Sequence, residues 1–84
     1  MKHYLSYATD EQAEEIRTLR KKLEISQYDL YLATGVNTRT ISHSEKFPYL
    51  IKKNTADKIL DSLHKILKDR KLEEQRLKRL YSST

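Results

Sequence analysis

The chain is poor in the residues that build disulfide frameworks, tight turns and sheets. Its 84 residues include no cysteine, no tryptophan, one glycine and one proline. Without cysteine, neither a disulfide nor a cysteine-based zinc site can supplement a small core. A chain of this length supports one domain, and its abundance of Leu, Ile, Lys and Glu is typical of helices. We therefore expect a single all-α domain that is stabilised by packing.

Long apolar runs are missing as well. Residues 1–8 lack the apolar stretch of about 7 or more residues that a signal peptide requires, and no segment has the length of apolar sequence that spans a bilayer. We expect a cytoplasmic protein with no membrane contact. The formal net charge is +5, with the basic excess in residues 26–84. Such an excess suits a polyanionic partner but also simply keeps a protein soluble, so charge alone assigns no function.

Helical periodicity begins near residue 10. Asp10 is expected to cap a helix that starts at Glu11. A second helix is expected after Ser26, because Ser26 and Asp29 form a carboxylate variant of the capping box. Gly35 can adopt the left-handed conformation that ends this helix. The apolar stripe of the first helix has spacings of three and four residues and consists of Ala13, Ile16, Leu19 and Leu23.

A third, short helix is expected from Asn37 or Thr38 to about Glu45, with Ile41 as its inward anchor. Two short helices joined by a tight glycine turn predict a helix-turn-helix. Pro48 then interrupts the helical pattern.

The chain from Thr55 to Thr84 contains neither glycine nor proline, so one long helix is expected there, capped near Asn54 and Asp57 and extending as far as Tyr81. Only its first half carries a continuous apolar stripe. The expected organisation is an N-terminal arm (residues 1–9), a helix-turn-helix domain (residues 10–67) and a charged helical extension (residues 68–84).

A set of residues within the expected domain keeps the order and spacing of a known motif. They are Ile16–Arg20, Ile25–Leu30, Thr34–Asn37, Thr40–Ser42, Glu45 and Asn54–Ile59. Across Ile16 to Leu67 the chain thereby resembles the Xre family, the Cro and phage-repressor type of helix-turn-helix protein. The resemblance implies a compact four- to five-helix lambda-repressor-like domain, here with an extended C-terminal helix. It also implies a regulator that binds double-stranded DNA, most often a repressor of phage, plasmid or mobile-element type.

The resemblance assigns roles to individual residues. The family's base contacts match Thr38, Arg39, Ser42 and His43. A helix of this length spans about 12 Å and fits a major groove about 12 Å wide, where arginine can pair with guanine. The family's phosphate clamp matches Gln27, where exposed amides of a helix N-terminus favour a phosphate. The remaining expected contacts are a structural salt bridge between Arg20 and Glu45, and phosphate contacts at Tyr28, Asn37, Lys52 and Lys53. The two lysines are equally open to being ordinary solvated side chains.

The chain departs from the family pattern at three positions. Tyr31 stands where the second helix normally has a small residue, and Ser44 stands where the third normally has a large apolar one. We expect the Tyr31 ring to fill the space left at Ser44, because cores tolerate volume-conserving changes best. Lys46 replaces a glycine cap, so the loop from Lys46 to Lys53 is expected to take an unusual path.

Nothing in the sequence favours catalysis or a bound cofactor. There is no nucleophilic cysteine, glycine-rich phosphate loop or His-Glu-x-x-His pattern. The histidines (His3, His43 and His64) do not have metal-ligand spacing, and His64 is expected to be hydrogen-bonded or half-exposed. We expect a non-enzyme without metal or cofactor.

The extension over residues 68–84 leaves the partners open. Its alternating charges are typical of a solvated helix. A heptad stripe that includes Leu77 and Leu80 favours a dimer contact, but Arg70 and Glu73 interrupt it. A homodimer on two DNA half-sites is the expected assembly. The alternative is a protein-interaction module, such as an antitoxin, in which residues 68–84 bind a regulatory partner; a sequestering protein that never touches DNA is the third hypothesis.

Overall fold

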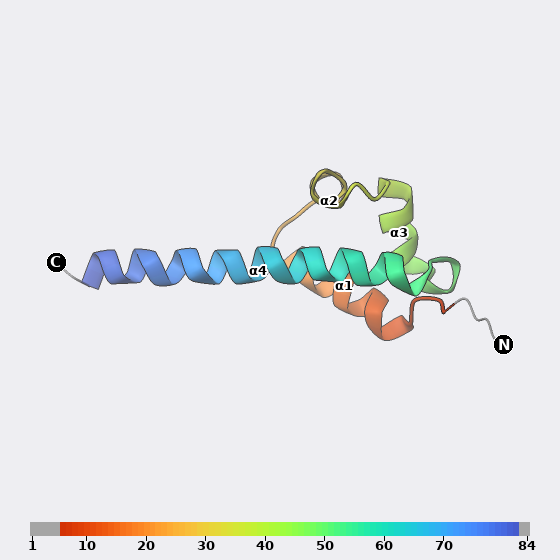
Figure 1. Cartoon of the computed structure of the whole chain (residues 1–84), viewed down its shortest axis with the longest axis horizontal. Helices are drawn as coiled ribbons and strands as arrows, with labels where there is room; N and C mark the ends of the chain where they lie inside the picture. The colour runs from red at the N-terminus through yellow and green to blue at the C-terminus, as the bar shows by residue number, and fades with distance from the viewer. Residues whose placement is uncertain (1–5, 83–84) are drawn as a thin grey trace.

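The computed structural model describes residues 6–82, and this part of the chain forms a small helical body with one long helix running out of it (Figure 1). The residues expected as an N-terminal arm (1–9) and His3 lie partly or wholly outside the described range. The expected all-α class is confirmed for the described residues. Their elements are α1 (Asp10–Lys22), α2 (Gln27–Thr34), α3 (Thr38–Lys46), the 3-10 turn η1 (Pro48–Leu50) and α4 (Lys53–Ser82).

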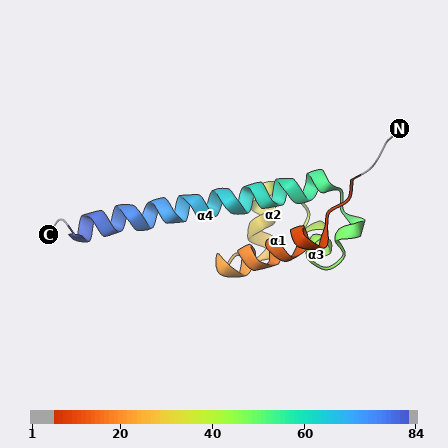
Figure 2. The same ribbon diagram turned by 90° about the horizontal axis from the view of Figure 1, so that it is seen from below.

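The other helices pack on the first half of α4 (residues 53–67). Figures 1 and 2 show α1 lying along it, while α2 and α3 stand on another side of it and η1 closes the end near the start of α4. The second half of α4 continues beyond the body, and this gives the molecule a long dimension of 61 Å against 27 and 20 Å. No helix in residues 6–82 combines the length and apolar character needed to cross a membrane.

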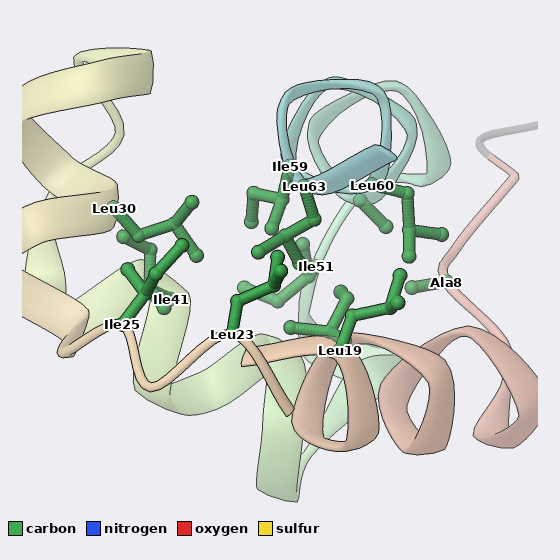
Figure 3. Packing of buried hydrophobic residues seen from close by; sticks show 12 residues of the cluster. Ala8, Leu19, Leu23, Ile25, Leu30, Ile41, Ile51, Ile59, Leu60 and Leu63 are labelled. Carbon is green, nitrogen blue, oxygen red and sulfur yellow. The ribbon is translucent and has the colours of Figure 1, made fainter. Parts of the chain in front are cut away.

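The core lies where these helices meet. Figure 3 shows Leu19 of α1 and Leu23, the residue after α1, directed towards α4, whose Leu63 is fully buried. Leu30 of α2 and Ile41 of α3 meet on the far side of the same cluster. The remaining buried members are Ala8, Ile16, Ile25, Ile51, Ala56, Ile59 and Leu60. The expected apolar stripes of the first helix and of the first half of the last helix are therefore the core faces.

The helix ends are fixed by local hydrogen bonds. Thr9, rather than the expected Asp10, caps α1, because its hydroxyl accepts from the Gln12 backbone N–H while the Gln12 side chain accepts from the Thr9 backbone N–H. Ser26 and Asp29 form the expected capping box of α2, with bonds of 3.0 and 3.2 Å. A capping box satisfies two backbone donors that the helix itself leaves unpaired.

Two helices end on left-handed residues. Gly35, at φ 76°, ends α2 as expected. At the end of α1, Glu24 has φ 56°, and the chain reverses with bonds from the Glu24 N–H to the Lys21 carbonyl and from the Ile25 N–H to the Arg20 carbonyl. This is the Schellman arrangement, which is usually completed by glycine. The sequence gives no sign of it at Glu24.

The segment before α1 pairs with the segment before α4. The Ala8 N–H donates to the Ile51 carbonyl at 2.8 Å, and the Lys53 N–H donates to the Ser6 carbonyl at 2.8 Å. The fourth helix begins at Lys53, slightly before the expected cap at Asn54. Asp57, expected as part of that cap, instead accepts from the Gln12 side chain at 2.8 Å and so ties α4 to α1.

Candidate nucleic-acid interface

Helix α3 presents one buried and one accessible face. Ile41, Ser44 and Glu45 are buried against the body. Of the four residues predicted to contact bases, Arg39 is exposed, and Thr38, Ser42 and His43 are partly exposed. All four side chains can donate or accept hydrogen bonds. The spacing of the inward residues therefore leaves a polar strip along a nine-residue helix.

The start of α3 is set by Asn37. Its side-chain oxygen accepts from the Arg39 backbone N–H at 2.7 Å, which makes it the helix cap. The capping bond holds the first turn of α3, where Thr38 and Arg39 lie, in one orientation. Asn37 itself remains exposed. The residue predicted to contact phosphate therefore has a structural role as well, as the cap of α3.

A shallow hollow joins the beginning of α2 to the beginning of α3. It has a volume of about 200 Å³ and is lined by Tyr28, Tyr31, Asn37 and Thr38. Three of these residues were predicted to contact phosphate or bases. The fourth, Tyr31, was not, although its ring lies beside that of Tyr28 with centroids 5.9 Å apart. The hollow thus brings predicted contact residues from two helices onto one surface.

The prediction that Tyr31 fills core space is wrong. Its side chain is 40% exposed and forms part of the surface. Ser44 is fully buried, and its hydroxyl donates to the Ile41 carbonyl at 2.6 Å. A buried hydroxyl that is hydrogen-bonded to its own helix avoids the cost of an unsatisfied polar group. The small side chain at position 44 is therefore accommodated without help from Tyr31.

The far end of α3 is tied to α1 by the expected salt bridge. The Arg20 guanidinium donates to the two carboxylate oxygens of Glu45 at 2.6 and 3.0 Å. Arg20 also donates to the Ile25 carbonyl at 3.1 Å, and Arg17 donates to the Glu45 carbonyl. The bond to Glu45 raises the pKa of the Arg20 guanidinium, against the opposing effect of burial. A bidentate arginine–carboxylate pair adds directional restraint to charge attraction.

An aromatic row follows the end of α3. The His43 and Phe47 rings lie 6.0 Å apart, edge to face, and the Phe47 and Tyr49 rings lie 6.2 Å apart in the same manner. Phe47 and Tyr49 are exposed on the loop that the sequence marked as unusual. The row orients the His43 ring, and neither Phe47 nor Tyr49 was predicted to be near the candidate site.

The predicted phosphate contacts do not form a single group. Gln27 opens α2 and is partly exposed, next to exposed Tyr28. Lys52 and Lys53 are exposed at the start of α4, which Figure 1 shows near the opposite end of α3 from α2. Lys53 forms an ion pair with Asp57 at 3.4 Å. The residues therefore lie at the two ends of α3, with the lysines on the side of η1.

The other polar contacts of the described residues do not build a metal site. His64 is hydrogen-bonded to Glu15 at 2.7 Å and about half exposed, as the sequence suggested. Within residues 6–82 no three His, Asp or Glu side chains are grouped as they would be around a metal ion.

Comparison with protein-family models, with curated proteins and with solved structures found no match to this chain.

Proposed function

We propose that the chain is a sequence-specific regulator that binds double-stranded DNA through a lambda-repressor-like helix-turn-helix of the Xre type, formed by α2 and α3. The observation that carries the proposal is the polar strip on α3, in which Thr38, Arg39, Ser42 and His43 are accessible while Ile41 and Glu45 face the body.

The dimensions and restraint of α3 support this function. Nine residues span about 13 Å, which suits a major groove about 12 Å wide. Asn37 fixes the start of the helix, and the Arg20–Glu45 pair fixes its end. A helix held at both ends lowers the conformational entropy lost when its side chains bind base edges.

The surroundings of α3 supply the sequence-independent part of binding. Gln27, Tyr28 and Asn37 lie around the beginning of the two helices, where side-chain donors and backbone amides suit phosphate oxygens. Lys52 and Lys53 lie towards the other end of α3 and reach the flanking backbone. Bound over a promoter, such a protein represses by blocking polymerase.

Selection from random-sequence duplex DNA tests the proposal. We expect an enriched site with two-fold symmetry, weakened by Arg39→Ala by about 1–3 kcal/mol and relaxed in sequence at one position. Lys65→Ala is the matched control, since it removes one positive charge from an exposed position on the long helix. Failure to enrich any site, with Arg39→Ala and Lys65→Ala weakening DNA binding equally at each salt concentration, would overturn the proposal.

A protein-interaction module, such as an antitoxin, is the second candidate. The observation that favours it is the second half of α4, which runs beyond the body with exposed Leu72, Leu77 and Leu80. Under this function, deletion of residues 68–84 abolishes the activity of the chain in its host. Under this function Arg39→Ala and Gln27→Ala leave that activity unchanged. If the chain is a DNA-binding regulator, the same two substitutions abolish the activity.

A further inference from the structure

The second half of α4 lacks the packing that stabilises the first half. Every residue from 68 to 81 is exposed, and both overall views show this segment running alone beyond α1 and α2 (Figures 1 and 2). In proteins most helical stability comes from packing of an apolar face, and here Leu72 and Leu77 stay exposed. Local pairs such as Glu73–Arg76, at 3.0 Å, are exposed and add little stability. A helix laid beside the segment would cover these exposed leucines.

One stripe of α4 connects the body to this segment. At alternating spacings of four and three residues, it passes from the body to the exposed end through Leu63, Ile66, Arg70, Glu73, Leu77 and Leu80. Apolar residues stand at both ends of the stripe, and two residues of opposite charge stand in the middle. Ile66 is partly buried and packs on the edge of the core, while Leu77 is exposed.

The two charged residues distinguish the orientations in which a second copy can pair. In a parallel, in-register pair, Arg70 faces Arg70 and Glu73 faces Glu73 of the second copy, and like charges at core positions repel. In an antiparallel pair centred between residues 71 and 72, each Arg70 faces a Glu73. The same register places each Ile66 opposite a Leu77.

We propose that two copies of this chain associate through antiparallel α4 helices centred between residues 71 and 72. Reciprocal Arg70–Glu73 ion pairs lie at the middle, and Ile66–Leu77 contacts lie on either side. The interface is isologous, as a closed two-fold dimer requires. The two bodies then lie at opposite ends of the paired helices, with the exposed leucine of each tail covered at the edge of the other body.

The existing contacts of the central residues are compatible with this pairing. Arg70 donates one N–H to the Leu23 carbonyl at the end of α1, which holds its side chain on the stripe. A guanidinium has further N–H donors, and a carboxylate that accepts from Arg76 still has a second oxygen. Glu73 can therefore accept from both Arg76 of its own chain and Arg70 of the second copy.

Sedimentation equilibrium without DNA tests the dimer separately from the proposed DNA-binding function. We expect Glu73→Arg to weaken the wild-type dimer at least tenfold, because it places two arginines at each central contact. The double variant R70E/E73R restores the dimer to within about threefold, because the opposite charges face each other again. Asp61→Arg is the control, since it makes the same charge change at an exposed position away from the stripe. Arg70→Glu alone also removes the bond to Leu23, so Glu73→Arg is the decisive single change.

A chain without cysteine also allows a direct test of orientation. An equimolar mixture of Ile66→Cys and Leu77→Cys is expected to form the mixed disulfide on mild oxidation, while neither variant alone forms one efficiently. Homodisulfides of each variant alone would indicate a parallel pair and overturn the proposal. A wild-type chain that stays monomeric at millimolar concentration, or a dimer indifferent to Glu73→Arg, would overturn it as well. Circular dichroism confirms that each variant retains its helices.

Discussion

The two halves of α4 have similar helical sequence but different surroundings. In the first half, Ala56, Ile59 and Leu63 are all fully buried, whereas in the second half Leu72, Leu77 and Leu80 are 54, 41 and 59% exposed. The difference comes from α1 and α2, which reach only the first half (Figure 1). Periodicity therefore predicts that both halves are helical, but only the neighbouring elements decide which leucines become a core.

Arg70 lies at the transition between the halves. Its bond to the Leu23 carbonyl places a cation at the C-terminal end of α1, where the helix dipole favours positive charge. The stripe that is apolar within the body thus becomes charged where the body ends. Replacing a leucine of α4 by alanine should therefore change the free energy of unfolding by different amounts on the two sides of Arg70.

The largest contrast is expected between Leu63→Ala and Leu77→Ala. Leu63 is enclosed by the core, so its truncation removes apolar burial and leaves a cavity, at a cost of about 2–5 kcal/mol in the free energy of unfolding. Leu77→Ala should cost less than about 1 kcal/mol in the monomer, because most of its burial awaits a partner. Urea denaturation at a concentration where the chain is monomeric measures both. Equal losses would show that the exposed half of α4 packs on the body.

The sequence predicts the helices well because their stripes and caps are local features. The stripe of α1 and the capping box at Ser26 both lie within a few residues of where the pattern places them. The contacts of the candidate site are harder to predict from the sequence. The expected Arg20–Glu45 pair came from a family resemblance, since no local rule links residues so far apart in the chain. The structure contains this pair.

What sequence reasoning missed depends on how separate segments meet. Tyr31 looked like a core residue because its size complements that of Ser44, but the two helices leave its ring in a surface hollow. The aromatic row of His43, Phe47 and Tyr49 requires the path of the loop after α3, which no periodicity specifies. Contacts of this kind follow from tertiary structure and have no signal in composition or spacing.

A smaller contrast is expected between two ion pairs. Glu45→Ala should cost about 2–3 kcal/mol, because Glu45 is buried and its loss leaves the partly buried Arg20 without its carboxylate. Glu73→Ala should cost at most about 0.5 kcal/mol in the monomer, since its pair with Arg76 is exposed and screened.

Thermal unfolding of both variants at low protein concentration, with Arg20→Lys as a further variant, checks this difference. Lysine keeps the charge but loses the bidentate geometry, so an intermediate loss is expected. A cost for Glu73→Ala as large as that for Glu45→Ala would mean that the tail contributes to the stability of the monomer.

No variant is expected to change stability by more than about 1 kcal/mol at the two left-handed residues, Glu24 and Gly35, which lie where the chain reverses within the body. A Cβ added at Gly35 would meet no atom within 4 Å. Gly35→Ala should therefore cost about 1 kcal/mol through the backbone conformation alone. Glu24→Gly should have the opposite sign and stabilise the protein by about 0.5–1 kcal/mol, since Glu24 already has a positive φ.

Glu24→Ala separates backbone conformation from charge in this last comparison. It removes a carboxylate near the C-terminal end of α1, where negative charge is unfavourable, but it keeps the Cβ. If the backbone conformation dominates, chemical denaturation shows a higher free energy of unfolding for Glu24→Gly but not for Glu24→Ala. If both substitutions stabilise equally, the strain at φ 56° contributes little. In that case the turn after α1 is held by its backbone bonds and by Arg20, whose guanidinium also donates to the Ile25 carbonyl.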